Sequence, residues 1–207
     1  MNYEILLGFV FATAVLSTSP GPDNIFVLTQ SIANGKKYGF ATIAGLMTGC
    51  LIHTSLLAFG VSTIIKNNET VFLIIKLFGV GYLLYLSYSV FKGGDKIEIE
   101  NNETSKVGLT ALFKKGFIMN VLNPKVTIFF LAFFPGFLFS ETMNTVWQFY
   151  ILGFVFIATS TVVFGLIAIL AGVISNYILK TPKAGLFLKW LQIIVFIGIA
   201  IYLLLSE

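Results

Sequence analysis

Two short polar segments interrupt the apolar runs of this 207-residue chain, and each joins a proline to an ionisable side chain. They are Gly21-Pro22-Asp23-Asn24 and Asn123-Pro124-Lys125, whose prolines are 102 positions apart. An ionised group inside a membrane span costs at least about 2.5–3.5 kcal/mol on insertion scales, so such groups indicate function. A carboxylate and an ammonium at one site can pair with each other, or with the opposite charges of a zwitterionic ligand.

The first segment breaks an apolar run that is too long for one simple crossing. As a continuous helix, Ile5–Ala33 would reach about 43 Å, whereas the hydrocarbon core of a bilayer is about 30 Å thick. Proline on both sides of Gly21 removes backbone donors, which predicts unwound backbone near the middle of the run. Such backbone is tolerated at membrane depth only where protein buries it or where it lines a wet cavity. The alternative is a packing kink, which explains the prolines but not Asp23.

The second segment has the form of a helix start. Asn123 suits an N-cap and Pro124 suits the first helical position, but a cation such as Lys125 opposes the helix dipole there. Snorkelling to the membrane surface is one explanation for Lys125, and a functional partnership with Asp23 is the one we favour. If the two segments meet near the midplane, two helix N-termini point at one cavity, which suits a carboxylate.

Other polar groups inside the apolar runs are weaker signals. His53 is the only histidine, and without a carboxylate or cysteine cluster it is either a proton carrier or a satisfied core residue. Cys50, the single cysteine, is expected to be a small core residue. Thr159-Ser160-Thr161 either lines a path or bonds back to its own helix. Gly45 and Gly49 are expected to allow close contact between helices.

Composition places most of the chain in lipid. Hydrophobic residues make up 57% of the sequence and charged residues 11%, with a mean hydropathy of +0.94, whereas soluble domains carry about 25% charged residues. We therefore predict an all-α polytopic membrane protein with six transmembrane helices in two inverted three-helix repeats, helices 1 and 4 being broken. The six runs are Ile5–Ala33, which is expected to be retained rather than cleaved, Phe40–Ile65, Val71–Phe91, Phe117–Phe139, Val146–Val173 and Gly185–Leu205.

Lysine placement predicts the orientation. The first, third and fifth connections carry ten lysines, whereas Lys66 stands alone in the second and fourth. By the positive-inside rule the lysine-rich connections are cytoplasmic and both termini are external. The polar interval 92–115 is expected to be a cytoplasmic loop that divides a single transporter domain, residues 1–207, into half-repeats 1–91 and 116–207. The net charge of +4 thus reflects membrane topology, and no nucleic-acid partner is expected.

Enzyme chemistry has no signature in the sequence. The chain contains no Gly-rich phosphate loop with Lys-Ser/Thr, no His-Glu-x-x-His and no Gly-x-Ser-x-Gly elbow. We expect no catalytic residues, no metal and no cofactor. Transport by this chain would draw on an ion gradient. The candidates for substrate and ion binding are Asp23, Lys125, Asn123, Gly21, Pro22, Pro124, His53 and Asn24.

Three motifs follow one another along the chain: the Pro-Gly-Pro break, a Lys-x-x-Gly-x-x-Tyr-Leu-Leu run that starts at Lys76, and the Asn-Pro-Lys turn. In this order and spacing they resemble the lysine-exporter (LysE/RhtB) family, and the resemblance covers essentially the whole chain. Gly136 is a departure, because many members carry glutamine there. Further segments that carry the resemblance are Gly45 and Gly49 with His53, Asn120-Val121-Leu122, Phe129–Pro135 and Gly198.

This resemblance implies an exporter in the bacterial plasma membrane for amino acids of the homoserine, threonine, leucine or lysine type. Export in this family is thought to be coupled to proton entry, so the implied partners are the amino acid, the proton and the lipid bilayer. A homo-oligomer is left open. Two alternatives remain, an exporter of cations or of another small solute, and a non-transporting membrane subunit. The isolation of His53 and Cys50 argues against a metal cage.

Overall fold

The computed structural model describes residues 2–19, 21–62, 69–93, 108–181 and 184–205, and these residues form helices without any strand. The predicted all-α membrane fold is therefore confirmed. The elements are α1 (Tyr3–Thr18), α2 (Pro22–Asn34), α3 (Lys36–Leu56), the π-helical η1 (Leu57–Val61), α5 (Glu69–Lys92), α6 (Leu109–Val121), α7 (Pro124–Phe133), the 3-10 turn η2 (Phe134–Phe137), α8 (Thr145–Ile169), α9 (Ala171–Lys180) and α10 (Ala184–Leu205).

Among the described residues, four helices are long and apolar enough to cross a membrane, and the number rises to six if each of two bent helix pairs is one span. The bent pairs are α1 with α2, at 62°, and α6 with α7, at 52°. They fall where the first and fourth spans were predicted to break. The local cause is the same in both pairs, because proline occupies the first position of α2 and of α7.

Two predicted boundaries were wrong. The interval 92–115 was expected to be a loop, but α6 begins at Leu109 because Leu112 and Gly116 are buried and anchor its first turns. The fifth span was expected to reach Val173, but α8 ends at Ile169 and α9 follows in another direction. The 25 residues of α8 already reach about 37 Å, enough to cross the hydrocarbon.

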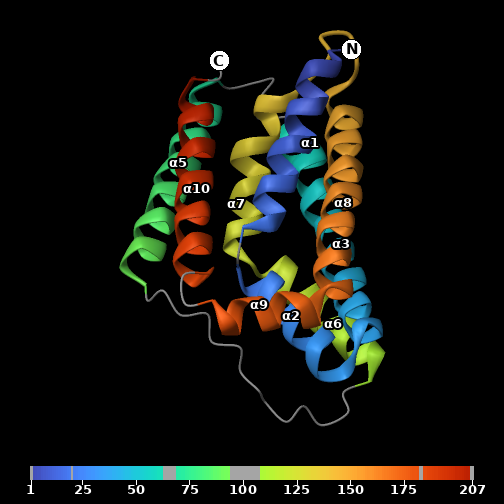
Figure 1. Ribbon diagram of the computed structural model, residues 1–207. Coiled ribbons are helices and arrows are strands. Elements are labelled where there is room, and N and C mark those ends of the chain that lie inside the picture. Colours follow the sequence, from blue (N-terminus) through green and yellow to red (C-terminus); the bar gives the residue numbers. More distant parts are fainter. Residues whose placement is uncertain (1, 20, 63–68, 94–107, 182–183, 206–207) are drawn as a thin grey trace.

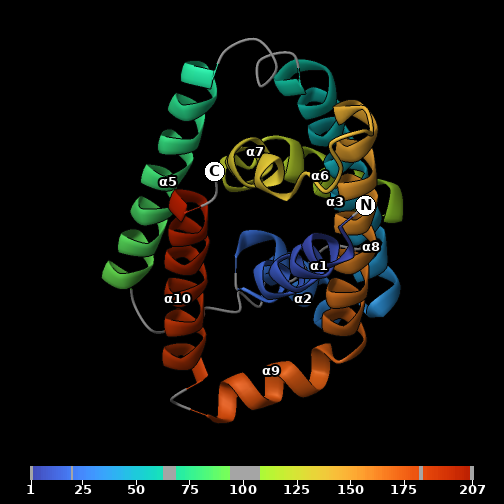
Figure 2. The same cartoon turned by 90° about the horizontal axis from the view of Figure 1, so that it is seen from above.

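Both chain ends lie at one face of the molecule, which we call the terminal face, and α9 lies across the opposite face (Figure 1). In this view α1 runs away from the terminal face and α7 runs toward it, so the two broken pairs are antiparallel. Seen from above, α1, α2, α6 and α7 occupy the centre, with α3 and α8 on one side and α5 and α10 on the other (Figure 2). This arrangement brings the two breaks together.

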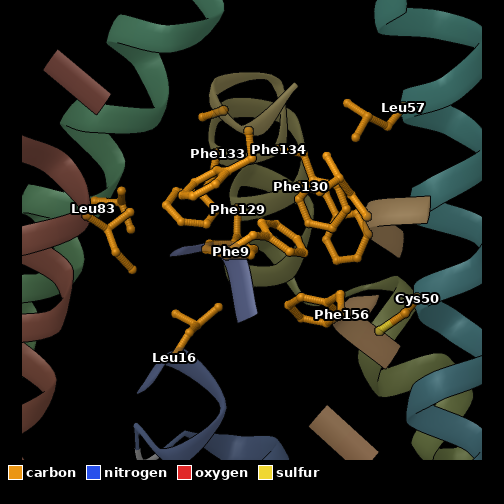
Figure 3. Close-up of a cluster of buried hydrophobic side chains, with 14 of the residues drawn as sticks. Phe9, Leu16, Cys50, Leu57, Leu83, Phe129, Phe130, Phe133, Phe134 and Phe156 are labelled. Atoms are coloured by element: carbon orange, nitrogen blue, oxygen red, sulfur yellow. The ribbon is translucent and has the colours of Figure 1, made fainter. Parts of the chain in front are cut away.

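Phenylalanine rings fill the centre of the bundle (Figure 3). Spacing of four residues on α7 stacks Phe129 on Phe133 at 4.4 Å between ring centroids. Phe130 stacks on Phe134 at 4.1 Å in the same way. Phe9 of α1 meets Phe134 edge-to-face at 5.0 Å. We call the buried set of Phe9, Phe129, Phe130, Phe133, Phe134, Phe137 and Phe156 the phenylalanine cluster.

Glycines let α3 approach α6 backbone to backbone. The sequence predicted a close helix contact at Gly45 and Gly49, but it indicated neither the partner helix nor Gly116. A Cβ atom on Gly45 would lie 2.0 Å from the carbonyl oxygen of Phe113 on α6. One on Gly116 would lie 2.4 Å from the carbonyl oxygen of Thr42. No side chain larger than hydrogen fits at either position, so the contact depends on these residues.

Candidate functional site

The two helix breaks enclose one small cavity between α1, α2, α3, α6, α7 and α8. Its volume is about 50 Å³, which has room for a few water molecules but not for an amino acid. Both halves of the chain contribute polar side chains to its wall. The lining residues are Leu16, Ser17, Gly21, Pro22, Asp23, Asn24, Leu46, Met47, Cys50, Asn120, Asn123, Lys125, Val126, Phe156 and Phe164.

Asn123 links the two breaks directly. Its Nδ2 donates a hydrogen bond to Oδ2 of Asp23 at 3.2 Å, across 100 positions of sequence. Its Oδ1 accepts from the backbone N–H of Lys125 at 3.0 Å, which makes it the predicted N-cap of α7. One buried amide therefore starts α7 and also holds the carboxylate of α2.

Lys125 lines the cavity from the first turn of α7. Its Nζ lies 5.0 Å from the ring centroid of Phe196 on α10. A Cβ atom on Gly21 would lie 3.3 Å from the same Nζ, so the glycine leaves room for the ammonium. Within the described part of the chain, Lys125 and Asp23 form no ion pair at 4.0 Å or closer. The two opposite charges thus line one cavity without closing on each other.

The break of the first pair is held by polar bonds to its neighbours. Asn24 Nδ2 donates to the carbonyl oxygen of Ser17 at 2.7 Å, which satisfies an orphan acceptor at the end of α1. The hydroxyl of Ser17 bonds that of Ser160 on α8 at 2.9 Å. Ser160 therefore contacts the broken helix rather than its own. Gly21 is the N-cap of α2 and supplies no side-chain cap, and Pro20 lies outside the described residues.

His53 does not line the cavity, and neither does Pro124. The buried His53 ring places Nε2 3.1 Å from the carbonyl oxygen of Asn120, in the last turn of α6. Because a carbonyl only accepts, Nε2 carries the hydrogen of this bond. His53 thus ties α3 to the end of α6, one residue shell away from the cavity. The other six candidates, Asp23, Lys125, Asn123, Gly21, Pro22 and Asn24, come together at the cavity wall.

Sequence reasoning missed Asn120 as a site residue. It lines the cavity with 3% of its surface exposed, and its Nδ2 donates to Sγ of Cys50 at 3.5 Å. The available signal was a polar side chain one helical turn before Asn123, on the same face of the broken span. In the residues that the structure describes, no three His, Cys, Asp or Glu side chains are grouped to hold a metal ion.

Comparison with known proteins decides the family. The family described as "LysE type translocator" matches residues 14–207. The chain belongs to this family. The homoserine/homoserine lactone efflux proteins of Salmonella typhimurium and of Salmonella typhi are each 33% identical to it over 184 residues, which cover 88% of this chain and 87% of the relative. No solved structure is significantly similar to it.

Membership in the LysE-type translocators confirms the resemblance seen in the motifs. The chain is a multi-pass membrane transporter, with lipid around it and a small molecule as its substrate. In this translocator the cavity between the broken helices is lined by both an acidic and a basic side chain, Asp23 and Lys125, which makes it the candidate substrate site.

Proposed function

We propose that this LysE-type translocator exports amino acids from the bacterial cytoplasm, with homoserine and similar amino acids as its substrates. The observation that carries the proposal is the placement of Asp23 and Lys125 on one cavity wall without a direct ion pair. A zwitterion has a matching pair of opposite charges. The two homoserine/homoserine lactone efflux relatives support homoserine as the first substrate to test.

Each end of the substrate has a partner in this arrangement. The substrate carboxylate meets the ammonium of Lys125 and the uncapped N-terminus of α2, which favours anions. The substrate ammonium meets Asp23, whose Oδ2 is already held by Asn123. Binding therefore separates two charges that compensate each other through space in the empty site.

Transport requires the cavity to enlarge, because about 50 Å³ does not hold an amino acid. The phenylalanine cluster follows the cavity along α7 toward the terminal face and closes that direction. Its rings form one connected network, in which Phe9 contacts Phe133, Phe134 and Phe137. Rearrangement of the broken helices around the cavity then exposes the site to one side of the membrane at a time.

Proton antiport is the coupling that we propose. The sequence has no nucleotide-binding motif, so the free energy for export comes from an ion gradient. Asp23 is a carboxylate at the substrate site, and it takes a proton when the substrate ammonium leaves. The lysine bias supports a plasma-membrane orientation with both termini external, so that substrate enters from the lysine-rich face.

The test is exchange by the purified chain alone in proteoliposomes. Vesicles are loaded with labelled homoserine, threonine, leucine or lysine, and efflux is followed with and without an imposed pH gradient. We expect homoserine efflux, and we expect it to be faster when the outside is more acidic than the vesicle interior, because protons then enter as homoserine leaves. Efflux of Na⁺, K⁺ or Zn²⁺ alone would instead support a cation exporter. A chain that moves none of these solutes would support a membrane subunit that does not transport.

A further inference from the structure

Two buried oxygen atoms in the cavity wall have no hydrogen-bond partner, Oδ1 of Asp23 and Oδ1 of Asn120. Unpartnered buried polar atoms are rare, because each one costs the free energy of its lost hydration. Both atoms accept hydrogen bonds and neither donates when the carboxyl is ionised. A bound donor with more than one hydrogen would satisfy both acceptors.

The side chain and the backbone of Asn120 are each held by neighbouring residues. Its side-chain Nδ2 donates to Cys50 Sγ. Its backbone carbonyl oxygen accepts from Nε2 of His53 and from the N–H of Asn123, each at 3.1 Å. Gly49 stands directly opposite, where a Cβ atom would lie 2.6 Å from Oδ1. Gly49 thus leaves room for the Asn120 side chain, whose Oδ1 keeps an acceptor without a hydrogen bond in the described structure.

We infer that Asn120 is a second receptor for the substrate ammonium and that the site selects an unsubstituted, primary ammonium. This inference rests on the proposed function. An –NH₃⁺ group has three donors, of which Oδ1 of Asp23 and Oδ1 of Asn120 accept two. A tertiary ammonium has a single N–H and leaves one buried acceptor unpaired. A monovalent cation also favours oxygen ligands, but unlike a zwitterion it brings no carboxylate to pair with the ammonium of Lys125 on the same wall.

His53 and Cys50 act through Asn120 in this account. They are positioning residues, because each bonds to Asn120 and neither is needed to touch the substrate. The backbone carbonyl of Asn120 lies one turn before the break, so the bond from His53 also sets where α6 ends.

The experiment measures how N-methylation of the substrate weakens binding. Wild-type proteoliposomes exchange whichever labelled amino acid they move fastest among homoserine, threonine, leucine and lysine. Its N-methyl and N,N-dimethyl forms compete with that exchange. We expect the dimethyl form to compete about ten- to a hundredfold less well than the primary amine, the effect of one hydrogen bond to a charged group. Equal competition by the primary amine and by the N,N-dimethyl form would overturn the inference.

Asn120→Leu is the decisive variant, because leucine has a similar branched shape and no acceptor. In this variant we expect the primary amine and the N,N-dimethyl form to compete almost equally well. The ratio of their inhibition constants then falls to near one, since both forms bind through Asp23 alone. Asn120→Asp keeps an acceptor at this position and should keep most of the ratio, whereas Cys50→Ala removes the bond that positions the amide and should lower the ratio. A leucine variant that exchanges substrate with the wild-type ratio would contradict the role of Asn120.

The experiment distinguishes failure of the proposed function from failure of the inference about Asn120. Wild-type protein that exchanges no amino acid overturns the proposed function together with the inference. Wild-type protein that exchanges amino acids but ignores N-methylation overturns the inference alone. If Asn120→Leu does not reach the membrane, the selectivity of the wild type and of Cys50→Ala still tests the inference.

Discussion

At the scale of single residues, Asn123 has two separable duties. Its Oδ1 caps α7 and its Nδ2 holds Asp23. Asn144 performs only the first duty for α8, because its Oδ1 accepts from the N–H of Val146 at 2.9 Å and it lies exposed outside the cavity. The chain therefore supplies a matched pair of capping asparagines.

We predict that Asn123→Ala abolishes most export and Asn144→Ala does not. Each loses about 1 kcal/mol of helix capping, but only Asn123→Ala also releases the carboxylate of Asp23. Initial export rates, divided by the amount of protein in the membrane, should fall at least about tenfold for the first variant. Equal losses in both variants would show that the cap alone matters.

His53 gives a second prediction at this scale. Its bond to the Asn120 carbonyl needs a donor, and it lines no part of the cavity. His53→Gln keeps a side-chain N–H and should retain export driven by a pH gradient. His53→Leu leaves the Asn120 carbonyl with one donor fewer and should lower the thermal stability. Loss of proton coupling in His53→Gln, with uncoupled exchange retained, would make His53 the proton carrier instead.

At the scale of elements, the contact between α3 and α6 depends on glycine. Gly45→Ala should lower the temperature of thermal inactivation and the amount of protein in the membrane, because its Cβ meets the Phe113 carbonyl at 2.0 Å. Gly81→Ala on α5 is the control, since nothing lies within 4 Å of its added Cβ. Alanine there is expected to be neutral or to stabilise the helix by up to about 1 kcal/mol. A tolerated Gly45→Ala would contradict the backbone contact.

The sequence predicted the elements where the cause is local. Proline at the first position of α2 and of α7 fixes both breaks, and Asn123 caps α7 as its type and position indicated. The start of α6 and the end of α8 were missed because tertiary packing decides them. Leu112 anchors the first turns of α6 among buried residues, and no breaker marks the change from α8 to α9 before Gly172.

Some residues of the candidate site could also be predicted from local sequence, and others could not. Charge and proline identified Asp23 and Lys125, since an ionised group in an apolar run stands out in any sequence. The role of Asn120 depends on Cys50 and His53, which are 70 and 67 positions away in the chain. No local pattern encodes such a contact. The bond from His53 to Asn120 also joins residues far apart in the sequence. His53 was therefore predicted to bind substrate or an ion, although it lies behind the cavity wall.

At the scale of the whole molecule, orientation in the membrane is the first consequence to test. Lys36 lies exposed at the start of α3, away from the terminal face, and Glu141 lies exposed between η2 and α8. With the lysine-rich side in the cytoplasm, an impermeant thiol reagent added to whole cells should label Glu141→Cys and spare Lys36→Cys. The unmodified chain, whose Cys50 is buried, is the control. Labelling of Lys36→Cys alone would reverse the topology.

Broken helices from both halves of the chain place Asp23 and Lys125 on one cavity. We propose that a zwitterion binds between these two residues. Neutralising one residue leaves the other charge buried without compensation, so Asp23→Asn and Lys125→Met should each lose export. The single variants also fail if the two charges serve only to stabilise the fold. The double variant separates these explanations.

The most direct measurement is therefore export of labelled homoserine by the Asp23→Asn/Lys125→Met double variant in proteoliposomes, together with its abundance in the membrane. Our account predicts that abundance returns to the wild-type level, because no buried charge is left unpaired. It also predicts that export stays absent, because neither end of the zwitterion has a partner. Recovery of wild-type export in the double variant would contradict the account and reduce the two residues to a structural pair.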